Sequence, residues 1–429
     1  MRAARESVVG HLCGAPMRRT HNQGGTAMSK PLDGIKVIEI GQEIQGPFAA
    51  LVLADMGASV IKIENRETGD LSRWLTCGLI GGPEAKNQEV SFYFTAMNRG
   101  KRSITVDLKK PRGVGLIHRL ARSSDVLLTN YRPGVLDRLG LGFEDLLKDN
   151  PKIVYAQASS WGPKGPWVKR PSRDTLAQAA SGLMAKTGMP EDPPLAAGIA
   201  IADHAGAMSL AAGVLGALFA RERTGKGQRV DASIFGTLIA MQGFELNFVS
   251  MSGRDTLRAG RGHQFLHGVW GAYRTSDGWL CIAGVDDKRW PDFCRVMGIQ
   301  HLQDDPQFDN PTRNFHGWKM IEVLDSIFPK KTTREWLEEL TAVDVLATEV
   351  ADYRMLLKSE QARVNGYLQE LDHPSAGRVL VSGTPISYNG EVRTQSPPAP
   401  EWGQHTEEVL LEFGYSWEEI AALRDEGAV

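Results

Sequence analysis

The chain has 429 residues, of which 42% are hydrophobic and 23% are charged, and its formal net charge is −2. These fractions are those of a globular protein and exclude bulk disorder. No apolar run approaches the roughly 18 residues that a membrane span needs. The balanced charge argues against a dedicated nucleic-acid binder. At about 150 residues per domain, the length predicts two or three domains.

Residues 1–27 differ from the rest of the chain. The segment is rich in Arg, Gly, Ser and Thr, contains one acidic residue, Glu6, and lacks the apolar core of a secretory signal. Its glycines and Pro16 would interrupt an amphipathic helix of the transit-peptide type. We therefore expect a disordered N-terminal extension with few ordered contacts.

Strands and helices alternate through the first part of the chain. A strand over 35–40, rich in β-branched residues, is followed by a helix over 48–56 and a second strand over 59–64. The later elements are a strand over 103–106, a helix over 111–121, a strand over 126–129, a helix over 134–139 and a strand over 153–157. This order predicts an α/β fold with a doubly wound, Rossmann-like parallel sheet.

The loop after the first strand is a candidate ligand site. It reads Gly41-Gln42-Glu43-Ile44-Gln45-Gly46-Pro47, and it lacks the second glycine of the GxGxxG fingerprint. A dinucleotide enzyme is therefore disfavoured. Ligands nevertheless bind at the carboxyl ends of the strands in open α/β sheets, which is where this loop should lie.

The second part of the chain has longer helices and a hairpin. The sequence predicts a helix over 205–223, a strand over 229–233, a helix over 237–251 and a Gly- and Arg-rich loop over 252–264. Beyond this loop it predicts strands over 269–274 and 278–283, helices over 290–298, 320–328 and 333–341, and two helices within 397–429. The segment Ser276-Asp277-Gly278 is a typical hairpin turn.

Cysteine usage indicates a reducing compartment. The four cysteines are Cys13, Cys77, Cys281 and Cys294; they form no CxxC pair, and no histidine pair stands near them at zinc-ligand spacing. We therefore expect reduced thiols, no bound metal, and a cytoplasmic protein without a membrane or nucleic-acid partner.

Eight short segments together resemble the class III coenzyme A-transferase family, which includes formyl-CoA transferase, the carnitine CoA-transferase type and α-methylacyl-CoA racemase. In chain order they are Pro31–Val37, Leu53–Glu64, Asn98–Ser103, Asn130–Gly134, Leu183–Gly188, Ile201–Asp203, Arg223–Gln228 and Gly403–Glu408. Each segment alone is weak evidence, but their common order is specific. The resemblance covers residues 31–425.

The resemblance implies a domain organisation, an assembly and substrates. It implies a discontinuous large α/β domain of residues 28–228 and 340–429, with a smaller α+β domain of residues 229–339 inserted. It also implies an interlocked homodimer. The substrates would be a coenzyme A thioester and a carboxylic acid, and no cofactor would be bound permanently.

Cations near strand ends suit the phosphates of CoA. Such cations are Lys101, Arg102, Lys109, Arg132 and Arg138. The resemblance to formyl-CoA transferase implies that the CoA site is lined by Val106, Lys109, Asn130, Tyr131 and Arg138. Arg102 is a further candidate. Arg66 is expected to replace the arginine that the family often has at the position of Asn65.

The transfer of CoA between two acids needs a nucleophile that forms a mixed anhydride, and a carboxylate can do this. The family uses an aspartate shortly after a Thr-Gly turn, and here the turn is followed by Met189-Pro190-Glu191-Asp192-Pro193-Pro194. Counted back from Asp203, the formyl-CoA transferase spacing falls on Glu191 and the carnitine-type spacing on Asp192. Glu191, Asp192 and a solvated turn without a nucleophile are the three interpretations.

The loop Gly260-Arg261-Gly262-His263-Gln264 matches the glycine loop that closes over the site in formyl-CoA transferase. Its glycines would permit that closure, and Arg261 and His263 are candidates for contacting the acid; the alternative is an ordinary flexible loop. Ile44 stands where formyl-CoA transferase has a glutamine that binds the acyl oxygen. Gln45 is the candidate replacement, and the apolar Ile44 favours an acyl group larger or less polar than formyl or oxalyl.

We predict a CoA-transferase that moves CoA from an acyl-CoA donor to a carboxylic acid through an acyl-enzyme anhydride. One alternative is an acyl-CoA racemase, which needs two bases flanking the α-carbon. Arg173 occupies the position of the family histidine and cannot exchange a proton near neutral pH. Asp203 would be the second base, or else the cap of a helix that begins at Ala205. The other alternative is a non-catalytic CoA-thioester-binding protein.

Overall fold

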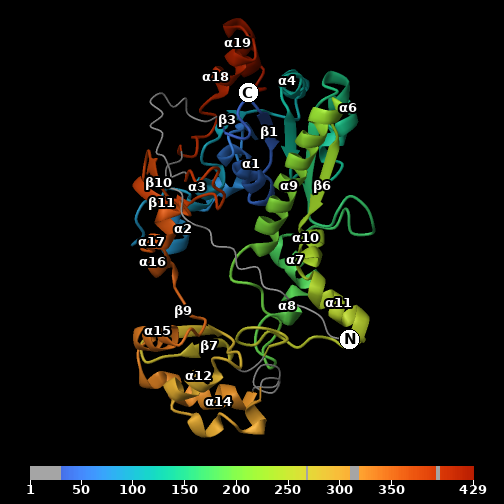
Figure 1. The fold of residues 1–429 in the computed structure, drawn as a ribbon. Coiled ribbons are helices and arrows are strands. Elements are labelled where there is room, and N and C mark those ends of the chain that lie inside the picture. Colours follow the sequence, from blue (N-terminus) through green and yellow to red (C-terminus); the bar gives the residue numbers. More distant parts are fainter. Residues whose placement is uncertain (1–29, 267–268, 310–317, 393–396) are drawn as a thin grey trace, which may run out of the picture.

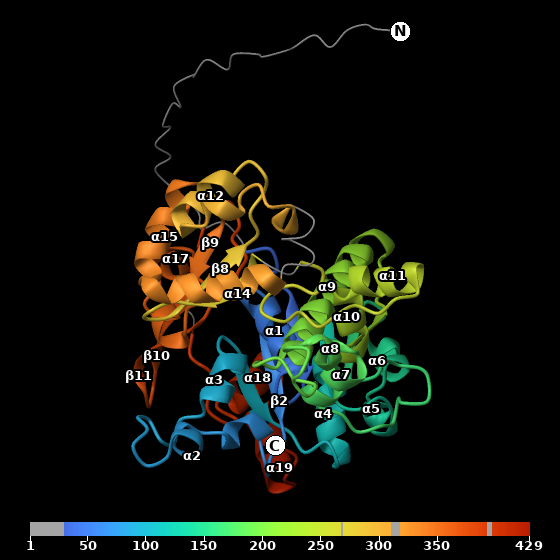
Figure 2. The same ribbon diagram turned by 90° about the horizontal axis from the view of Figure 1, so that it is seen from below.

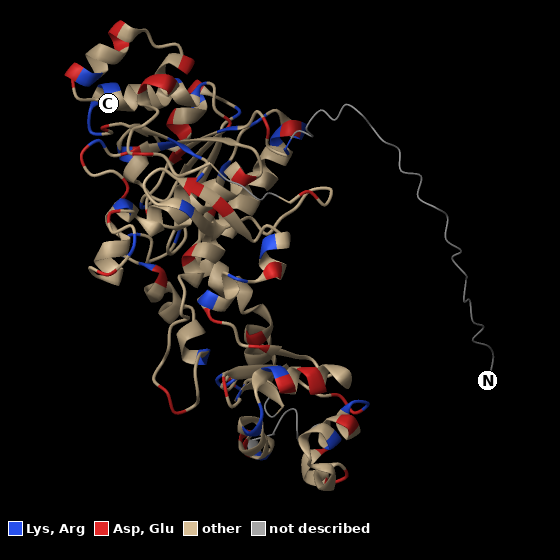
Figure 3. Ribbon diagram, turned by 90° about the vertical axis from the view of Figure 1, so that its left-hand side faces the viewer, with Lys and Arg blue, Asp and Glu red and all other residues tan. Residues whose placement is uncertain are grey.

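The computed structural model describes residues 30–266, 269–309, 318–392 and 397–429. The expected N-terminal extension over residues 1–27 lies outside the described residues. Figure 1 shows an upper part built around a parallel sheet and a lower part in which helices pack on a small antiparallel sheet. Acidic and basic residues are interspersed in both parts (Figure 3), as the near-zero net charge suggests.

The large sheet has the strand order β3-β2-β1-β4-β5-β6, and each neighbouring pair is parallel. Its strands are β1 (Lys36–Ile40), β2 (Ser59–Glu64), β3 (Arg102–Thr105), β4 (Val126–Thr129), β5 (Val154–Ser159) and β6 (Arg229–Ser233). The predicted doubly wound α/β sheet is thus confirmed. The strand order reverses between β1 and β4, and such a reversal is where ligands bind in open α/β sheets.

Two hydrophobic cores cover the two faces of the large sheet. On one face pack α1 (Gln45–Asp55) and α9 (Ile201–Thr224), through small and apolar residues such as Leu53 and Leu210. On the other face pack α4 (Pro111–Ala121), α5 (Val135–Arg138), α6 (Phe143–Asp149), α18 (Thr406–Glu412) and α19 (Trp417–Asp425). The C-terminal helices therefore complete the core of the N-terminal sheet (Figure 1).

Local sequence signals set the ends of several helices. Proline opens α4, where its missing N–H would have had no intrahelical partner. The helices α15 (Thr333–Ala342) and α19 begin with capping boxes at Thr332 and Ser416. Gly225 ends α9 with a φ of 67°, a conformation that glycine adopts without strain.

The small antiparallel sheet has the order β7-β8-β9, with strands β7 (Trp270–Arg274), β8 (Trp279–Ala283) and β9 (Ala347–Glu349). It packs with α12 (Trp290–Met297), α14 (Trp318–Ile327) and α15 around an aromatic core that includes Phe293, Phe328 and Trp336. Because β6 belongs to the large sheet and β9 to the small one, these sheets extend beyond the expected domain boundaries at residues 228 and 339.

The helix expected over 237–251 is two helices, α10 (Ile234–Met241) and α11 (Gly243–Ser252), which meet at 66°. The break falls at Gln242, whose ψ of 24° departs from the helical value, and Gly243 follows it. An unpredicted hairpin, β10 (Leu368–His373) and β11 (Gly377–Ser382), lies beside α2 (Cys77–Gly81) and α3 (Phe92–Asn98).

Short elements connect these parts. They are the helices α7 (Asp174–Ala180), α8 (Leu183–Lys186), α16 (Tyr353–Leu356) and α17 (Glu360–Val364) and the 3₁₀ turns η1 (Leu71–Trp74), η2 (Gln300–Leu302), η3 (Pro306–Phe308) and η4 (Phe328–Lys330). Seen from below, α9, α10 and α11 lie on one side of the molecule, and α12, α14 and α15 lie on the other (Figure 2).

By length and composition alone, α9 could cross a membrane, and so could α10 and α11 taken together. An 18-residue window of α9 has a mean hydropathy of 1.3, which comes mainly from its Ala, Leu and Val residues, although the helix contains no unbroken apolar run of membrane length. Packed core helices of globular proteins have the same property. In this structure α9 packs against α1, α10, β5 and β6.

Candidate active site

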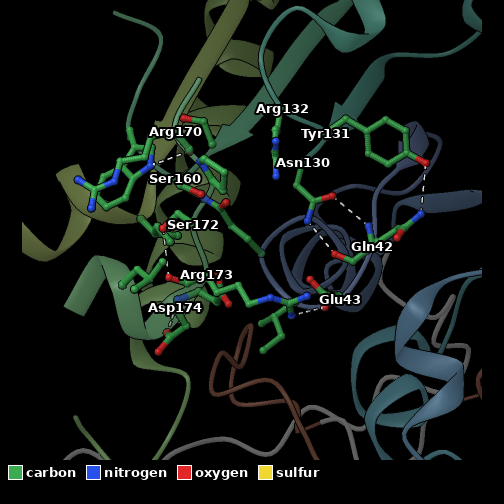
Figure 4. A pocket seen from close by; sticks show the side chains of 18 of the residues that line it. Gln42, Glu43, Asn130, Tyr131, Arg132, Ser160, Arg170, Ser172, Arg173 and Asp174 are labelled. Atoms are coloured by element: carbon green, nitrogen blue, oxygen red, sulfur yellow. Dashed lines mark hydrogen bonds and ion pairs between the residues drawn. The ribbon is translucent and has the colours of Figure 1, made fainter. Parts of the chain in front are cut away.

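A pocket of about 790 Å³ opens where the strand order reverses between β1 and β4. Its walls come from the loops that follow β1, β4 and β5 and from the first turn of α9 (Figure 4). The lining includes Gln42, Asn130, Ser160, Arg173 and Asp203. The candidate loop 41–47 therefore forms one wall of this pocket, in agreement with the carboxyl-end rule.

Asn130 holds this loop in place. Its Nδ2 donates to the carbonyl oxygen of Gln42 at 2.7 Å, and its Oδ1 accepts from the backbone N–H of the same residue at 2.9 Å. A Cβ at Gly46 would lie 3.0 Å from the Cγ of Asn130, so glycine lets the loop approach this closely. Tyr131 adds a hydrogen bond from the Gln42 amide to its hydroxyl (Figure 4).

A buried ion network lies beneath the same loop. The Lys62 Nζ is 2.8 Å from Glu39 Oε1 and 2.7 Å from Asp70 Oδ2, and it donates to the Gly41 carbonyl at 3.0 Å. Burial disfavours the ammonium of Lys62, but Glu39, Asp70 and Glu64 outweigh burial and raise its pKa. The network therefore fixes the start of the loop from below.

Lys101 belongs to this network and not to a phosphate site. Its Nζ donates to Glu39 Oε2 at 2.6 Å and to the Pro47 carbonyl at 2.8 Å, and its side chain is fully buried. Burial lowers the pKa of Lys101 to about 8. The sequence analysis counted Lys101 among the cations for CoA, and this burial corrects that expectation.

Three carboxylates face one another at the pocket. The backbone N–H of Asp203 donates to Asp174 Oδ1 at 3.1 Å, and Glu43 pairs with Arg173 at 2.9 Å (Figure 4). Burial, together with the charges of Asp174 and Glu43, raises the pKa of Asp203 to about 7. Glu43 belongs to the candidate loop 41–47, and Asp174 follows Arg173, which occupies the position of the family histidine, but neither acid was assigned a role from the sequence.

Asp203 does not cap a helix that begins at Ala205. The helix α9 begins four residues earlier, at Ile201, with Ala200 at its N-cap. Asp203 therefore lies inside the first turn and faces the pocket. The prediction placed the start of the helix too late because Ile201 and Ala202 follow a segment rich in Pro and Gly.

The raised pKa of Asp203 has a consequence for stability. Between the ordinary pKa of 3.8 and the folded value of about 7, the folded protein binds more protons than the unfolded chain. The free energy of unfolding should therefore fall as the pH rises through this range. We expect the Asp203→Asn variant to lose this part of the slope, which urea unfolding at pH values from about 5 to about 8 would measure. An unchanged slope would contradict the assignment.

The predicted CoA-binding residues separate into three groups. Asn130 and Tyr131 line the pocket, Val106 is buried in the core, and Lys109 and Arg138 are exposed. Arg102 lies at the amino end of β3, where it pairs with Glu408 at 3.2 Å and Glu412 at 2.6 Å. These ion pairs neutralise the charge of Arg102 at the edge of the sheet opposite the pocket. They correct the expectation that Arg102 binds CoA.

A second, smaller hollow of about 420 Å³ lies beyond the carboxyl end of β3. Arg66, Trp402 and Arg424 line it. Asn65 uses its side-chain oxygen to accept from the N–H groups of Glu67 and Thr68, and so it shapes the turn that carries Arg66. Arg66 thus lines this hollow together with a second cation, Arg424. Its role in place of an arginine at position 65 stays a prediction.

The two candidate nucleophiles have different surroundings. Asp192 Oδ2 accepts from the Met189 N–H at 2.7 Å, so this carboxylate closes its own turn. Glu191 is exposed, and its carboxylate makes no hydrogen bond or ion pair within the described residues. Neither residue lines the 790 Å³ pocket.

The glycine loop lies directly against the turn that carries these two acids. The Gly260 N–H donates to the Gly188 carbonyl at 3.2 Å, and the Ala259 N–H donates to the Lys186 carbonyl at 3.0 Å. The structure therefore brings together two segments that the sequence analysis selected separately. A Cβ at Gly262 would lie 2.8 Å from the Trp270 carbonyl, so glycine permits a close approach to β7 as well.

The remaining candidates of the substrate loop are held by neighbours. The His263 ring packs against Phe244 and Trp270, and Gln264 donates to Glu245. Gln45 is buried in the wall of the large pocket, and its Nε2 has no hydrogen-bond partner among the described residues. The role of Gln45 as the replacement next to Ile44 stays a prediction.

The sequence pattern of CoA-transferase family III matches residues 32–406. The chain belongs to this family. It is 32% identical over 404 residues to succinyl-CoA:glutarate CoA-transferase of Mus musculus. The alignment covers 93% of this chain and 88% of that protein. It is also 32% identical over 386 residues to acetyl-CoA:oxalate CoA-transferase of Acetobacter aceti, covering 89% of this chain and 96% of that protein.

A solved structure shows the same fold. A CAIB/BAIF family protein of Brucella suis has a TM-score of 0.77 and 28% sequence identity, with 90% of this chain and 100% of that chain covered. The predicted family and the enzyme class, a transferase, are therefore confirmed.

Proposed function

We propose that this enzyme transfers CoA from an acyl-CoA to a carboxylic acid by way of an anhydride on Glu191. The observation that supports this residue is the contrast within the turn. The carboxylate of Asp192 is engaged by the Met189 N–H, whereas that of Glu191 is exposed and available to attack. Glu191 also stands at the formyl-CoA transferase spacing from Asp203.

The reaction proceeds in balanced steps. The Glu191 carboxylate attacks the thioester carbonyl, the C–S bond breaks, and CoA leaves as a thiolate. The thiolate then attacks the glutamyl carbonyl, which releases the donor acid and leaves a glutamyl-CoA thioester. The acceptor carboxylate displaces CoA to give a second anhydride, and the thiolate attacks its acyl carbon, which forms the product acyl-CoA and restores Glu191.

The pocket supports a dicarboxylic acid as one substrate. Arg132, Arg170 and Arg173 all line it, and guanidinium groups bind carboxylates through paired hydrogen bonds. Arg132 has no ion-pair partner among the described residues. Two relatives are named for succinate, glutarate or oxalate, which are all dicarboxylic acids. We propose that one carboxylate of such an acid reacts while an arginine holds the other.

We also propose that the protein forms an interlocked homodimer and lies in the cytoplasm. The residues of the large sheet and those of the small sheet would form separate domains. The homodimer is supported by an apolar surface on α11. This helix has no buried residue and exposes Phe244, Leu246, Phe248 and Met251. Light scattering would give the mass in solution, and cell fractionation would test the compartment. A monomer would contradict the assembly.

The test of the reaction is a matrix of acyl-CoA donors against mono- and dicarboxylic acids, read by mass spectrometry. We expect acid-dependent CoA transfer, and hydroxylamine added with acyl-CoA should leave a hydroxamate on the peptide that contains Glu191. Binding of CoA thioesters without turnover for any acid would indicate a non-catalytic binding protein. Deuterium exchange at the α-carbon without an acceptor acid would indicate a racemase, with Asp203 as a base.

A further inference from the structure

An ion pair joins two walls of the large pocket (Figure 4). Arg173 Nη1 donates to Glu43 Oε1 at 2.9 Å; Glu43 belongs to the loop after β1, and Arg173 is the N-cap residue of α7. The Arg173 side chain is 76% exposed. A guanidinium carries several N–H donors in one plane, and this contact engages one of its nitrogens. The remaining donors can therefore receive a second carboxylate from a molecule in the pocket.

The backbone of Glu43 is held from below. Its φ is 64°, in the left-handed region that residues other than glycine seldom adopt. Its N–H donates to Asp70 Oδ1 at 3.1 Å, and the Asp70 carboxylate is itself buried 2.7 Å from Lys62 Nζ. Such backbone conformations persist where the surrounding structure holds them, and they cluster at ligand sites. Glu43 is therefore a fixed partner, and it gives the Arg173 guanidinium a defined place in the pocket.

The other two arginines of the pocket have different surroundings. The guanidinium carbon of Arg170 lies 5.4 Å from the ring centroid of Trp161 and 5.2 Å from that of Trp167. Cation–π attraction holds it to these rings. Arg132 is exposed, and its guanidinium makes no hydrogen bond or ion pair within the described residues. Arg173 is therefore the arginine of the pocket that an ion pair holds in place.

Arg173 also lies within electrostatic reach of the acids of the pocket. Burial, Asp174 and Glu43 raise the pKa of Asp203 to about 7, and the charge of Arg173 acts against this rise. The carboxylates of Asp174 and Glu43 disfavour a bound anion at this end of the pocket, and Arg173 offsets them. A dicarboxylic acid carries two negative charges into the pocket, so it needs this cation more than a monocarboxylic acid does.

We propose that Arg173 determines a preference for dicarboxylic acids: its remaining N–H groups bind the remote carboxylate of the acid, and Glu43 is a positioning residue that holds the guanidinium. This inference rests on the proposed function, because it takes the pocket as the place where the acid binds. It does not depend on which carboxylate of the enzyme forms the anhydride. Charge-assisted hydrogen bonds are about twice as strong as neutral ones, and a guanidinium matches both oxygens of a carboxylate.

The experiment compares acids that differ only in the remote carboxylate: succinate with butyrate, and glutarate with pentanoate. The full-length wild type, Arg173→Ala, Arg173→Lys and the control Lys169→Ala are titrated with each acid by calorimetry in the presence of CoA. The same proteins are assayed for CoA transfer to each acid. Lys169 is an exposed cation of the same segment and does not line the pocket.

We expect the wild type to bind at least one of the two dicarboxylic acids more than about tenfold tighter than its partner acid. Arg173→Ala should lower the affinity for that acid and its kcat/KM by roughly 10- to 100-fold, and the affinity for the monocarboxylic acid by less than about threefold. Arg173→Lys should keep part of the preference, because an ammonium retains the charge but not the planar fork. Lys169→Ala should behave like the wild type.

Two substitutions of Glu43 separate its position from its charge. The side-chain oxygen of Glu43→Gln can still accept from Arg173 Nη1, so this variant should keep the preference for the dicarboxylic acid. Glu43→Ala leaves the guanidinium without its partner and should reduce the preference about three- to tenfold. Glu43→Ala should have no further effect when it is combined with Arg173→Ala, since it acts through Arg173. A preference that is unchanged in Glu43→Ala, or lost equally in Glu43→Gln, would overturn the positioning role.

The outcomes distinguish this inference from the function on which it rests. If CoA is transferred but Arg173→Ala keeps the wild-type preference, or the wild type binds both acids of each pair alike, the role of Arg173 is wrong and the transfer reaction stands. If no acid accepts CoA but a dicarboxylic acid binds in a manner that depends on Arg173, the proposed reaction is wrong and the binding site stands.

Discussion

Glu191→Gln is expected to lower kcat by roughly 10⁴-fold, as the loss of a covalent nucleophile does in other enzymes. The amide that replaces the carboxylate is nearly isosteric but cannot form an anhydride. Binding of the CoA thioester should change little, because the amide of glutamine nearly matches the carboxylate in size and shape. Initial rates with saturating acid and acyl-CoA, together with calorimetric binding of the thioester, would measure both effects.

Asp192→Asn is the matched control for this substitution. The amide oxygen of asparagine can still accept from the Met189 N–H, so the turn should keep its shape. We expect kcat to fall less than about tenfold. A severe loss in Asp192→Asn combined with an active Glu191→Gln would assign the nucleophile to Asp192 instead.

Lys62→Met is expected to have the largest effect on stability. The substitution leaves Glu39 and Asp70 buried without the ammonium that joins them. Removal of one partner from a buried ion pair typically costs about 3–5 kcal/mol. The free energy of unfolding in urea would measure the loss, and the transition should retain its steepness if the denatured state is unchanged.

Arg334→Ala is the control for Lys62→Met, because Arg334 pairs with Glu338 at 3.2 Å on an exposed face of α15. Surface substitutions of this kind change stability by about 0.5 kcal/mol or less. A loss in Lys62→Met no larger than that in Arg334→Ala would show that the network beneath the loop does not stabilise the fold.

The elements of the large sheet could be predicted because their strands consist mainly of apolar residues, and apolar residues are the ones that a fold buries. Apolar, β-branched runs define β2 and β4, and the proline at the start of α4 fixes its first residue. The hairpin β10–β11 was missed because one of the two buried positions of β10 is the polar Gln369, so the strand shows no apolar alternation. Strands that are buried on both faces, and helices with a clear start signal, are therefore the elements that could be predicted.

The ion-pair partners of the charged residues at the site were harder to predict than the strands and helices. Lys101 and Arg102 are neighbours in the sequence, but one is buried on Glu39 and the other pairs with α18, more than 300 residues away. The partners of these side chains depend on tertiary packing, and the spacing of residues along the chain carries no information about that packing. The same holds for Arg173, whose partner Glu43 lies 130 residues before it. By contrast, Asn130 and the glycine loop belong to short local motifs, and both could be selected in advance.

The packing of α18 and α19 on the first strands has a consequence for synthesis at the ribosome. Ser103 and Gly403 are hydrogen-bonded although 300 residues separate them. One face of the large sheet, on which α4, α5 and α6 already pack, therefore stays incompletely covered while the small sheet and its helices are made, and its core is completed only when residues 406–425 emerge. During that interval the nascent chain exposes apolar strands such as β1 and β2, a state in which aggregation competes with folding. The late synthesis of α18 and α19 thus leaves an interval in which shielding of the unfinished sheet would favour folding over aggregation.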